Sequence, residues 1–155
     1  MTTSSQINKI LQSNDQFLGC YSPTQLPKIL PSPRKYLIIN TISSKIKLGH
    51  WTVIYFKSKT QVFYFNSFGG KLMNENIKKF LASRYKFVYY NQSQIQSFKS
   101  NNCAFFCIYF IQTVKCKHDY ARFLNLFNTR NFKENDNILY KLMYNTRKER
   151  ENKNF

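Results

Sequence analysis

Two histidines and four cysteines leave few pairs of residues that could carry nucleophilic chemistry in this chain. Cys103 follows a polar stretch and opens an apolar run that ends at Val114, so we expect it in the first turn of a buried helix. The positive end of the helix dipole favours a thiolate at that position. His50 stands just before an apolar run that begins at Trp51. An imidazole beside the thiol could take its proton and return it to a leaving amine, which points to acyl transfer.

The segments around this pair predict one α+β domain. Apolar runs and alternation predict strands at 35–41, 51–57, 61–66 and 85–90, the middle two joined as a hairpin. Helical spacing predicts helices at 5–13, 74–83, 103–114, 122–128 and 137–144. The four prolines fall between 23 and 33, so this stretch should be an extended connection.

Length and composition fit a single domain. The chain has 155 residues, of which 43% are hydrophobic and 17% aromatic, which is enough for one core. We expect that domain at 1–145 and a charged, frayed tail at 146–155. No apolar run reaches the length of a membrane span, and the first residues lack a secretory signal, so we expect no membrane association and reduced thiols.

The charge is strongly basic. Twenty-four Lys and Arg against seven Asp and Glu give a formal charge of +17, which favours a polyanionic partner such as nucleic acid. The basic residues are spread along the chain, and no base-reading motif is present, so we expect non-specific phosphate contacts to DNA. The alternative is that AT-rich codons produced this composition without selection for binding.

Several segments together resemble one protease family. They are GHWTVIYFKSKTQVFYFNSFGG at 49–70, QSFKSNNCAFFCIYF at 96–110, QFLGCY at 16–21 and LIINT at 37–41. These segments resemble the His-Trp strand pair, the Phe-Gly turn and the Gln and Cys motifs of adenovirus-type cysteine proteases. The stretch 16–115 is identified as similar to this adenain-like maturation protease family, which includes enzymes of virophages and virus-like transposons.

The resemblance implies a papain-like fold, with a central mixed β-sheet flanked by helices and the catalytic order His–Asn–Gln–Cys. Cys103 would be the nucleophile and His50 the general base and acid. Gln96 would donate to the oxyanion hole together with the backbone N–H of Cys103. The family has an acid just before the Phe-Gly turn, where this chain has Asn66. An amide oxygen can also orient the imidazole, so Asn66 is the expected orienter, and Glu75 is the second choice.

Four further residues are candidate substrate contacts by the same resemblance: Gly19, Cys20, Tyr21 and Trp51. For Trp51 we also expect packing beside the catalytic histidine, which would shield it. Cys20 has the alternative interpretation of a half-buried spectator. Ala104 stands where the family usually has Gly, and its methyl group could crowd the oxyanion pocket.

No metal or required cofactor is expected. Cys107 has the spacing of a core thiol one turn after Cys103. These two, with Cys116 and His118, form a pattern that matches no common zinc module, so we predict no zinc site. The resemblance suggests viral DNA as an activator. A disulfide-linked peptide activator is not expected, because 71–102 contains no cysteine.

The sequence therefore predicts a viral cysteine endopeptidase that cleaves capsid or other virion precursors at Gly-containing sites during maturation. We expect it to act as a monomer in the virion and at the host-cell assembly site. One alternative is a SUMO- or ubiquitin-like-protein peptidase, which shares the order of site residues. An alternative of another class is a non-catalytic, basic nucleic-acid-binding virion protein.

Overall fold

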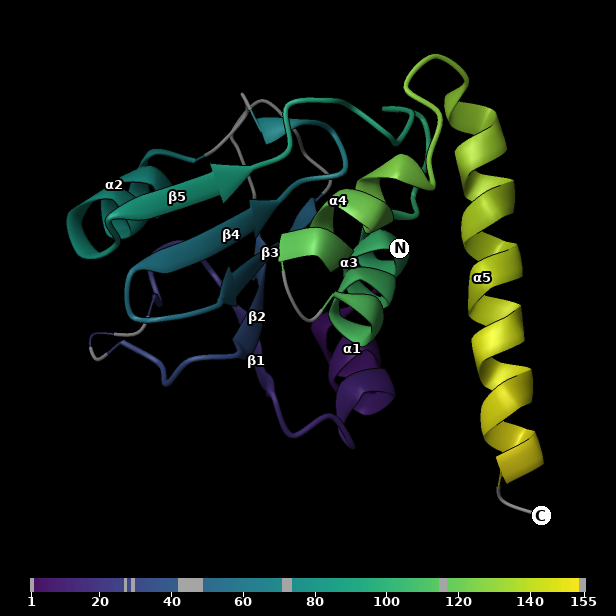
Figure 1. Cartoon of the computed structure of the whole chain (residues 1–155), viewed down its shortest axis with the longest axis horizontal. Coiled ribbons are helices and arrows are strands. Elements are labelled where there is room, and N and C mark those ends of the chain that lie inside the picture. Colours follow the sequence, from purple (N-terminus) through teal and green to yellow (C-terminus); the bar gives the residue numbers. More distant parts are fainter. Residues whose placement is uncertain are drawn as a thin grey trace.

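The computed structural model describes residues 2–26, 28, 30–41, 49–70, 74–114 and 117–153, with the backbone alone at 117, 118 and 146. Its five strands form one mixed sheet in chain order (Figure 1). The outer pairs β1–β2 and β4–β5 are parallel, whereas β2, β3 and β4 form an antiparallel meander. The strands are β1 (Phe17–Tyr21), β2 (Lys35–Asn40), β3 (Trp51–Phe56), β4 (Gln61–Phe65) and β5 (Phe87–Tyr90).

The central strands are apolar on both faces, because helices cover both sides of the sheet. Successive side chains point to opposite faces, so each strand divides its residues between two core clusters. The first cluster receives Tyr36, Ile38, Val53, Tyr55, Phe63 and Phe65, and the second receives Leu37, Ile39, Ile54, Phe56, Val62 and Tyr64. The expected α+β class, with a central mixed sheet flanked by helices, is confirmed.

The described residues form five helices, of which α2 packs on the second cluster while α1, α3 and α4 pack on the first (Figure 1). Their bounds are α1 (Ser4–Leu11), α2 (Glu75–Arg84), α3 (Cys103–Thr113), α4 (Lys117–Asn125) and α5 (Phe132–Lys153). Thr3 and Gln6 form a capping box that begins α1, and Asn74 caps α2 through its side chain. None of the described helices is both long and apolar enough to cross a membrane.

The last helix differs from the sequence-based prediction. A short helix at 137–144 and a frayed tail from 146 were expected, but α5 runs without interruption from Phe132 to Lys153. Its C-terminal half contains helix-forming charged residues, and Arg147 pairs with Glu151 one turn later at 3.1 Å. The charged pattern at 146–153 is therefore that of a solvated helix, which lies beside α3 (Figure 1).

The turn after β4 requires glycine at positions 69 and 70, because a side chain at either position would collide with its neighbours. Gly69 has a positive φ of 99°, and a Cβ there would lie 2.9 Å from the backbone oxygen of Gln92. Gly70 donates its N–H to the carbonyl of Asn91 at 2.6 Å, and a side chain there would collide with Tyr90. The two glycines thus let the end of β4 pass close to the segment that follows β5.

Candidate active site

His50 and Asn66 meet where β3 begins and β4 ends. Val53 pairs with Phe65 in the antiparallel ladder, and continuing this register outward brings Asn66 and Phe68 to the face of the hairpin on which His50 lies. The side chains follow this geometry: Nε2 of His50 lies 2.6 Å from Oδ1 of Asn66. Both residues are buried, with 5% and 2% of their surfaces exposed.

The tautomer of His50 follows from a second hydrogen bond to the same oxygen. The backbone N–H of Phe68 donates to Oδ1 of Asn66 at 2.9 Å, so this atom must be the amide oxygen. Nε2 of His50 therefore carries the hydrogen in this bond. In the neutral imidazole the lone pair is then on Nδ1, which is buried and has no hydrogen-bond partner among the described residues.

The ring that covers His50 belongs to Phe68. The two rings are stacked, with centroids 4.1 Å apart and planes inclined by 11°, and Phe98 packs on the far side of Phe68 at 4.8 Å. Trp51 was expected to shield the histidine, but its indole lies in the first core cluster and donates to the carbonyl of Thr2. Burial lowers the pKa of His50, and the hydrogen bond to Asn66 opposes this shift.

Cys103 is the first residue of α3, as expected. Its preceding residue, Asn102, does not cap the helix through its side chain. Burial raises the pKa of Cys103, while the backbone N–H groups of Trp51, Ala104 and Cys103 itself lower it. Desolvation is the largest of these effects, so burial opposes the thiolate that the helix dipole favours.

The Cys103 thiol lies close to the backbone of the residue that follows His50. Cys103 Sγ is close enough to the backbone of Trp51 for that amide to affect its pKa, and Trp51 directly follows His50. No hydrogen bond joins Nδ1 to the thiol, since Nδ1 has no partner. Catalytic hydrogen bonds are often long in unliganded enzymes and tighten when substrate binds. The arrangement fits a base that abstracts a thiol proton on substrate binding.

Gln96 lies in the loop that joins β5 to α3, and it is fully buried. Its Oε1 accepts from the hydroxyl of Ser67 at 2.5 Å, and its Nε2 donates to the carbonyl of Ser100 at 2.9 Å. The carbonyl of Ser67 also accepts the backbone N–H groups of Ile95 and Gln96. Because Ser67 directly follows Asn66, these bonds fix the Gln96 loop to the histidine orienter.

Asn91 is a structural partner of the site that sequence reasoning missed. Its Oδ1 accepts the backbone N–H of Asn66 at 3.0 Å, and its Nδ2 donates to the backbone carbonyl of Asn66 at 2.6 Å. The Asn91 side chain thus satisfies the backbone N–H and C=O of Asn66, just beyond the end of β4, as the backbone of a paired strand would. The one sequence signal for this role is that Asn91 is a polar residue directly after the predicted strand that became β5.

The two cysteines near the nucleophile are packed in the core. Cys107 is fully buried and donates to the carbonyl of Trp51 at 3.2 Å, in agreement with the expected core thiol. Cys20 is half-buried in β1, and burial raises its pKa to about 11. Gly19 has a φ of 122° beside an irregularity in the β1–β2 pairing. Tyr21 packs against the second core cluster. A substrate role for Gly19, Cys20, Tyr21 and Trp51 stays a prediction.

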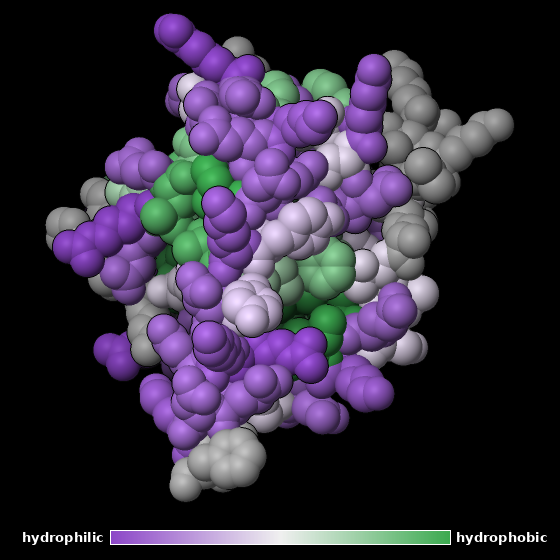
Figure 2. All heavy atoms as spheres, turned by 90° about the vertical axis from the view of Figure 1, so that its right-hand side faces the viewer, coloured by the Kyte–Doolittle hydropathy of each residue, from purple (hydrophilic) through white to green (hydrophobic). Residues whose placement is uncertain are grey.

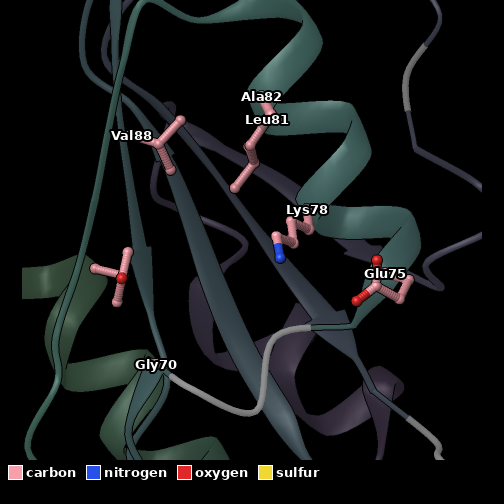
Figure 3. A pocket seen from close by; sticks show the side chains of 7 residues that line it. Gly70, Glu75, Lys78, Leu81, Ala82 and Val88 are labelled. Atoms are coloured by element: carbon pink, nitrogen blue, oxygen red, sulfur yellow. The ribbon is translucent and has the colours of Figure 1, made fainter.

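The second choice for the histidine orienter, Glu75, lies elsewhere. Figure 3 shows its side chain and that of Lys78 projecting from α2 toward a cavity of ≈340 Å³. This cavity is lined by α2, by Val88 and Tyr90 of β5, and by Gly70. Asn66, not Glu75, makes the hydrogen bond to His50.

Two remaining expectations concern the metal and Ala104. The described residues contain no group of three or more His, Cys, Asp or Glu that could hold a metal ion. Cys116 and the side chain of His118, which the zinc alternative would need, lie outside the described part of the structure. The methyl group of Ala104 is fully buried in the first core cluster, so it contributes to packing there.

Among known proteins, this chain matches solved structures alone. No family model matches the chain, and no curated protein matches it. Seven chains of solved structures match, and one of them is the ASFV pS273R protease in selenomethionine form. That alignment covers 68% of this chain and 42% of the protease chain, with 18% identity and a TM-score of 0.47. This chain thus matches less than half of that protease, and a likeness this low does not carry a functional argument.

Proposed function

We propose that the protein is a cysteine endopeptidase with a papain-like arrangement of its site residues. The single observation that carries this proposal is the state of His50. Its Nε2–H is fixed on Asn66, and its buried Nδ1 has no partner within the part of the chain that the structure describes. The next residue, Trp51, supplies a backbone amide that affects the pKa of Cys103. A histidine that only supported the core would be expected to have both ring nitrogens satisfied.

The mechanism follows from these positions. Nδ1 of His50 takes the proton of Cys103 Sγ, and the thiolate attacks the carbonyl carbon of the scissile bond. The oxyanion would be stabilised by the backbone N–H of Cys103 at the start of α3 and by Nε2 of Gln96, whose second hydrogen would turn from Ser100 Oγ, 3.4 Å away, to the oxyanion. The tetrahedral intermediate then collapses: the C–N bond breaks, the imidazolium gives its proton to the leaving amine, and the acyl group stays on Sγ as a thioester. A water molecule, deprotonated by Nδ1, hydrolyses the thioester and restores the thiol.

For the substrate, we propose precursors of capsid or other virion proteins, cleaved at Gly-containing sites during maturation in the virion or at the assembly site. The support is the resemblance of 16–115 to adenain-like proteases, together with the matching chemistry of the four site residues. Glycine is favoured where the peptide backbone must pass through a narrow cleft, because it has no side chain to clash. The proposed enzyme acts as a monomer and needs no metal.

The nearest enzymatic alternative is a peptidase for SUMO- or ubiquitin-like proteins, which would use the same four residues. It differs in needing a surface that docks a folded domain. The two are distinguished by comparing cleavage of a short Gly-Gly peptide with cleavage of a folded ubiquitin-like precursor that ends in Gly-Gly. Similar kcat/KM values on both favour the endopeptidase, whereas a large preference for the folded precursor would favour the alternative.

A non-catalytic nucleic-acid-binding role is the candidate from another class, and the charge is the observation that favours it. Among the described residues the one ion pair is Arg147–Glu151, so the +17 excess is largely free to attract phosphate. Figure 2, which faces α5, shows hydrophilic side chains over most of that side of the molecule. We propose that DNA binding accompanies proteolysis and activates it by confining enzyme and precursor together.

The proposal is tested by incubating the purified chain with a virion precursor extract and labelling new N-termini for mass spectrometry. The expected result is a set of new N-termini at Gly-containing sites that a peptide aldehyde inhibitor abolishes. If no inhibitor-sensitive termini are formed and short Gly-Gly peptides also stay intact, the endopeptidase is excluded and the nucleic-acid-binding role is favoured.

A further inference from the structure

The loop between β5 and α3 carries Gln96 and leads directly to Cys103, so its conformation sets both proposed oxyanion donors. Helix α5, which lies more than thirty positions later in the sequence, contacts this loop at three places. Asn135 donates to the carbonyl of Ile95 at 2.7 Å. Asp136 accepts from the hydroxyl of Ser100 at 3.1 Å.

The third contact involves the residue before the nucleophile. The amide of Asn102 donates to the hydroxyl oxygen of Tyr140 at 2.9 Å, and this hydroxyl donates back to Oδ1 of Asn102 at 3.1 Å. Asparagine at a helix N-cap usually accepts a hydrogen bond from the first turn. Here the side chain of Asn102 makes no such bond, because Tyr140 engages both of its polar atoms.

The contact between Ser100 and Asp136 determines how the serine hydroxyl is oriented. A carboxylate can only accept, so the hydroxyl hydrogen of Ser100 points to Asp136. The lone pairs of Ser100 Oγ are then turned toward the loop, where the backbone N–H of Asn102 approaches at 3.3 Å and Nε2 of Gln96 at 3.4 Å. The carbonyl of Ser100 accepts Nε2 of Gln96 at 2.9 Å.

We propose that Asp136 is a positioning residue for the oxyanion hole, acting through Ser100 on both Gln96 and the backbone that leads into Cys103. This inference rests on the proposed function. A half-buried carboxylate on α5 fixes the serine hydroxyl, and the serine in turn holds the amide of Gln96 and the entry to α3 in one geometry. Helix α5 is thereby part of the catalytic architecture as well as of the fold.

Asn135 and Asp136 are expected to differ in their roles. Asn135 is fully buried, and it bonds the backbone of Asn128 as well as that of Ile95, so its loss should destabilise the whole attachment of α5. Asp136 makes its described hydrogen bond to the hydroxyl of Ser100 alone. Substitution of Asp136 should therefore affect turnover more than stability, which makes it the informative position.

The experiment measures kcat and KM of the full chain on a fluorogenic Gly-Gly peptide, and Ki for the matching peptide aldehyde. The aldehyde forms an adduct with an oxyanion, so its affinity depends on the oxyanion hole. For Asp136→Ala we expect kcat to fall about tenfold, less than the roughly 10²–10³-fold loss of an entire donor. The aldehyde affinity should fall in parallel, and KM should stay within about twofold.

Three matched variants separate positioning from general structural damage. Asp136→Asn keeps an acceptor oxygen and should restore most of the turnover. Glu134→Ala removes the same charge from an exposed position of α5 whose described side-chain hydrogen bond is to Asn128, and it should leave kcat unchanged. In the Gln96→Ala background, Asp136→Ala should cost less than its tenfold loss in the wild type, because only its effect on the backbone leading into Cys103 remains. Thermal unfolding of each variant serves as a folding control, and Ser100→Ala provides a second test of the same link.

Wild-type kcat in Asp136→Ala and Ser100→Ala would overturn the inference while leaving the endopeptidase intact. A full multiplicative loss in the Gln96→Ala background would also overturn it, as would an equal loss in Glu134→Ala. Absence of Cys103-dependent cleavage by the wild-type chain is a different result, because it refutes the proposed function and the inference together.

Discussion

The amide oxygen of Asn66 accepts two hydrogen bonds, one from Nε2 of His50 at 2.6 Å and one from the backbone N–H of Phe68 at 2.9 Å. The second bond fixes which end of the amide faces the ring, and the first fixes which ring nitrogen carries the hydrogen. Asn66 therefore orients the imidazole without a negative charge. In this respect the site differs from those that use a carboxylate at the corresponding place.

Substitution of Asn66 tests this orientation. Asn66→Ala leaves two buried donors without their acceptor, so we expect kcat to fall by roughly 10²-fold, at the lower end of the usual contribution of general acid–base catalysis. Asn66→Asp keeps an acceptor oxygen for both donors, and should retain far more activity than the alanine variant. Steady-state kinetics of both variants on one peptide provides the measurement. Equal activity of Asn66→Ala and the wild type would mean that the amide does not orient the base.

The protonation of His50 gives a second prediction. Burial lowers its pKa below the ordinary value of about 6.5. Between about pH 6.5 and the lower pKa of the folded state, His50 binds a proton in the unfolded chain but not in the folded one. The free energy of unfolding therefore decreases as the pH falls through this window. Above about pH 6.5 His50 is neutral in both states and the decrease is absent. His50→Gln should flatten the fall in unfolding free energy between about pH 7 and pH 5.5. Identical pH dependence in both proteins would contradict the assignment.

NMR provides a direct reading of the same group, since the chain has only two histidines. We expect the His50 resonance to titrate below the ordinary histidine range. Phe68→Ala removes the ring that is stacked on the imidazole and should move its pKa upward by admitting water. An unchanged titration in Phe68→Ala would show that the stacked ring does not contribute to the desolvation.

The sequence predicted the elements whose patterns are strong, and it failed where geometry depends on distant contacts. Alternation identified β3 and β4, and the apolar run from Cys103 identified α3 with its first residue. β1 was missed, because Gly19 and an irregular pairing interrupt its short pattern. The full length of α5 was missed because its charged C-terminal half has no apolar pattern.

The site was predicted less completely than the fold. His50 and Asn66 were paired through the resemblance to the adenain-like family, and the structure joins them by a hydrogen bond. The sequence gives no sign that Phe68 stacks on the imidazole or that Asn91 clamps Asn66, since these contacts arise only when the turn and the next strand pack together. The burial of the Cys103 thiol, which raises its pKa against the effect of the helix N-terminus, could not be predicted either, because it is a property of the tertiary structure.

Gln96 supplies a further prediction. Gln96→Ala removes the proposed side-chain donor and should lower kcat by roughly 10²–10³-fold. Gln96→Glu keeps an acceptor for Ser67 but places an acceptor where Nε2 now donates to Ser100, so it should be no more active than the alanine variant. Peptide cleavage and aldehyde affinity provide the measurements. A Gln96→Ala enzyme with wild-type kcat would exclude Gln96 from the oxyanion hole.

The basic charge predicts salt-sensitive DNA binding without sequence preference. Fourteen Lys and Arg precede Cys103 and ten follow it, so the contacts should be distributed rather than confined to one tail. Binding to random duplexes should weaken with salt, with a log–log slope of about −0.9 for each phosphate neutralised. The measurement is fluorescence anisotropy at several salt concentrations, followed by cleavage assays with and without DNA. No binding at about 50 mM salt would leave codon bias as the explanation of the charge.

The central claim is that Cys103 is the nucleophile, and its neighbour in α3 provides a matched control. Cys107 is one turn later and fully buried, and serine can keep its hydrogen bond to the carbonyl of Trp51. The decisive measurement is therefore the rate of peptide cleavage by Cys103→Ser and Cys107→Ser, with thermal unfolding to show that both are folded. We predict that Cys103→Ser loses nearly all cleavage and that Cys107→Ser retains it. Cleavage by Cys103→Ser at more than a few per cent of the wild-type rate would contradict the account.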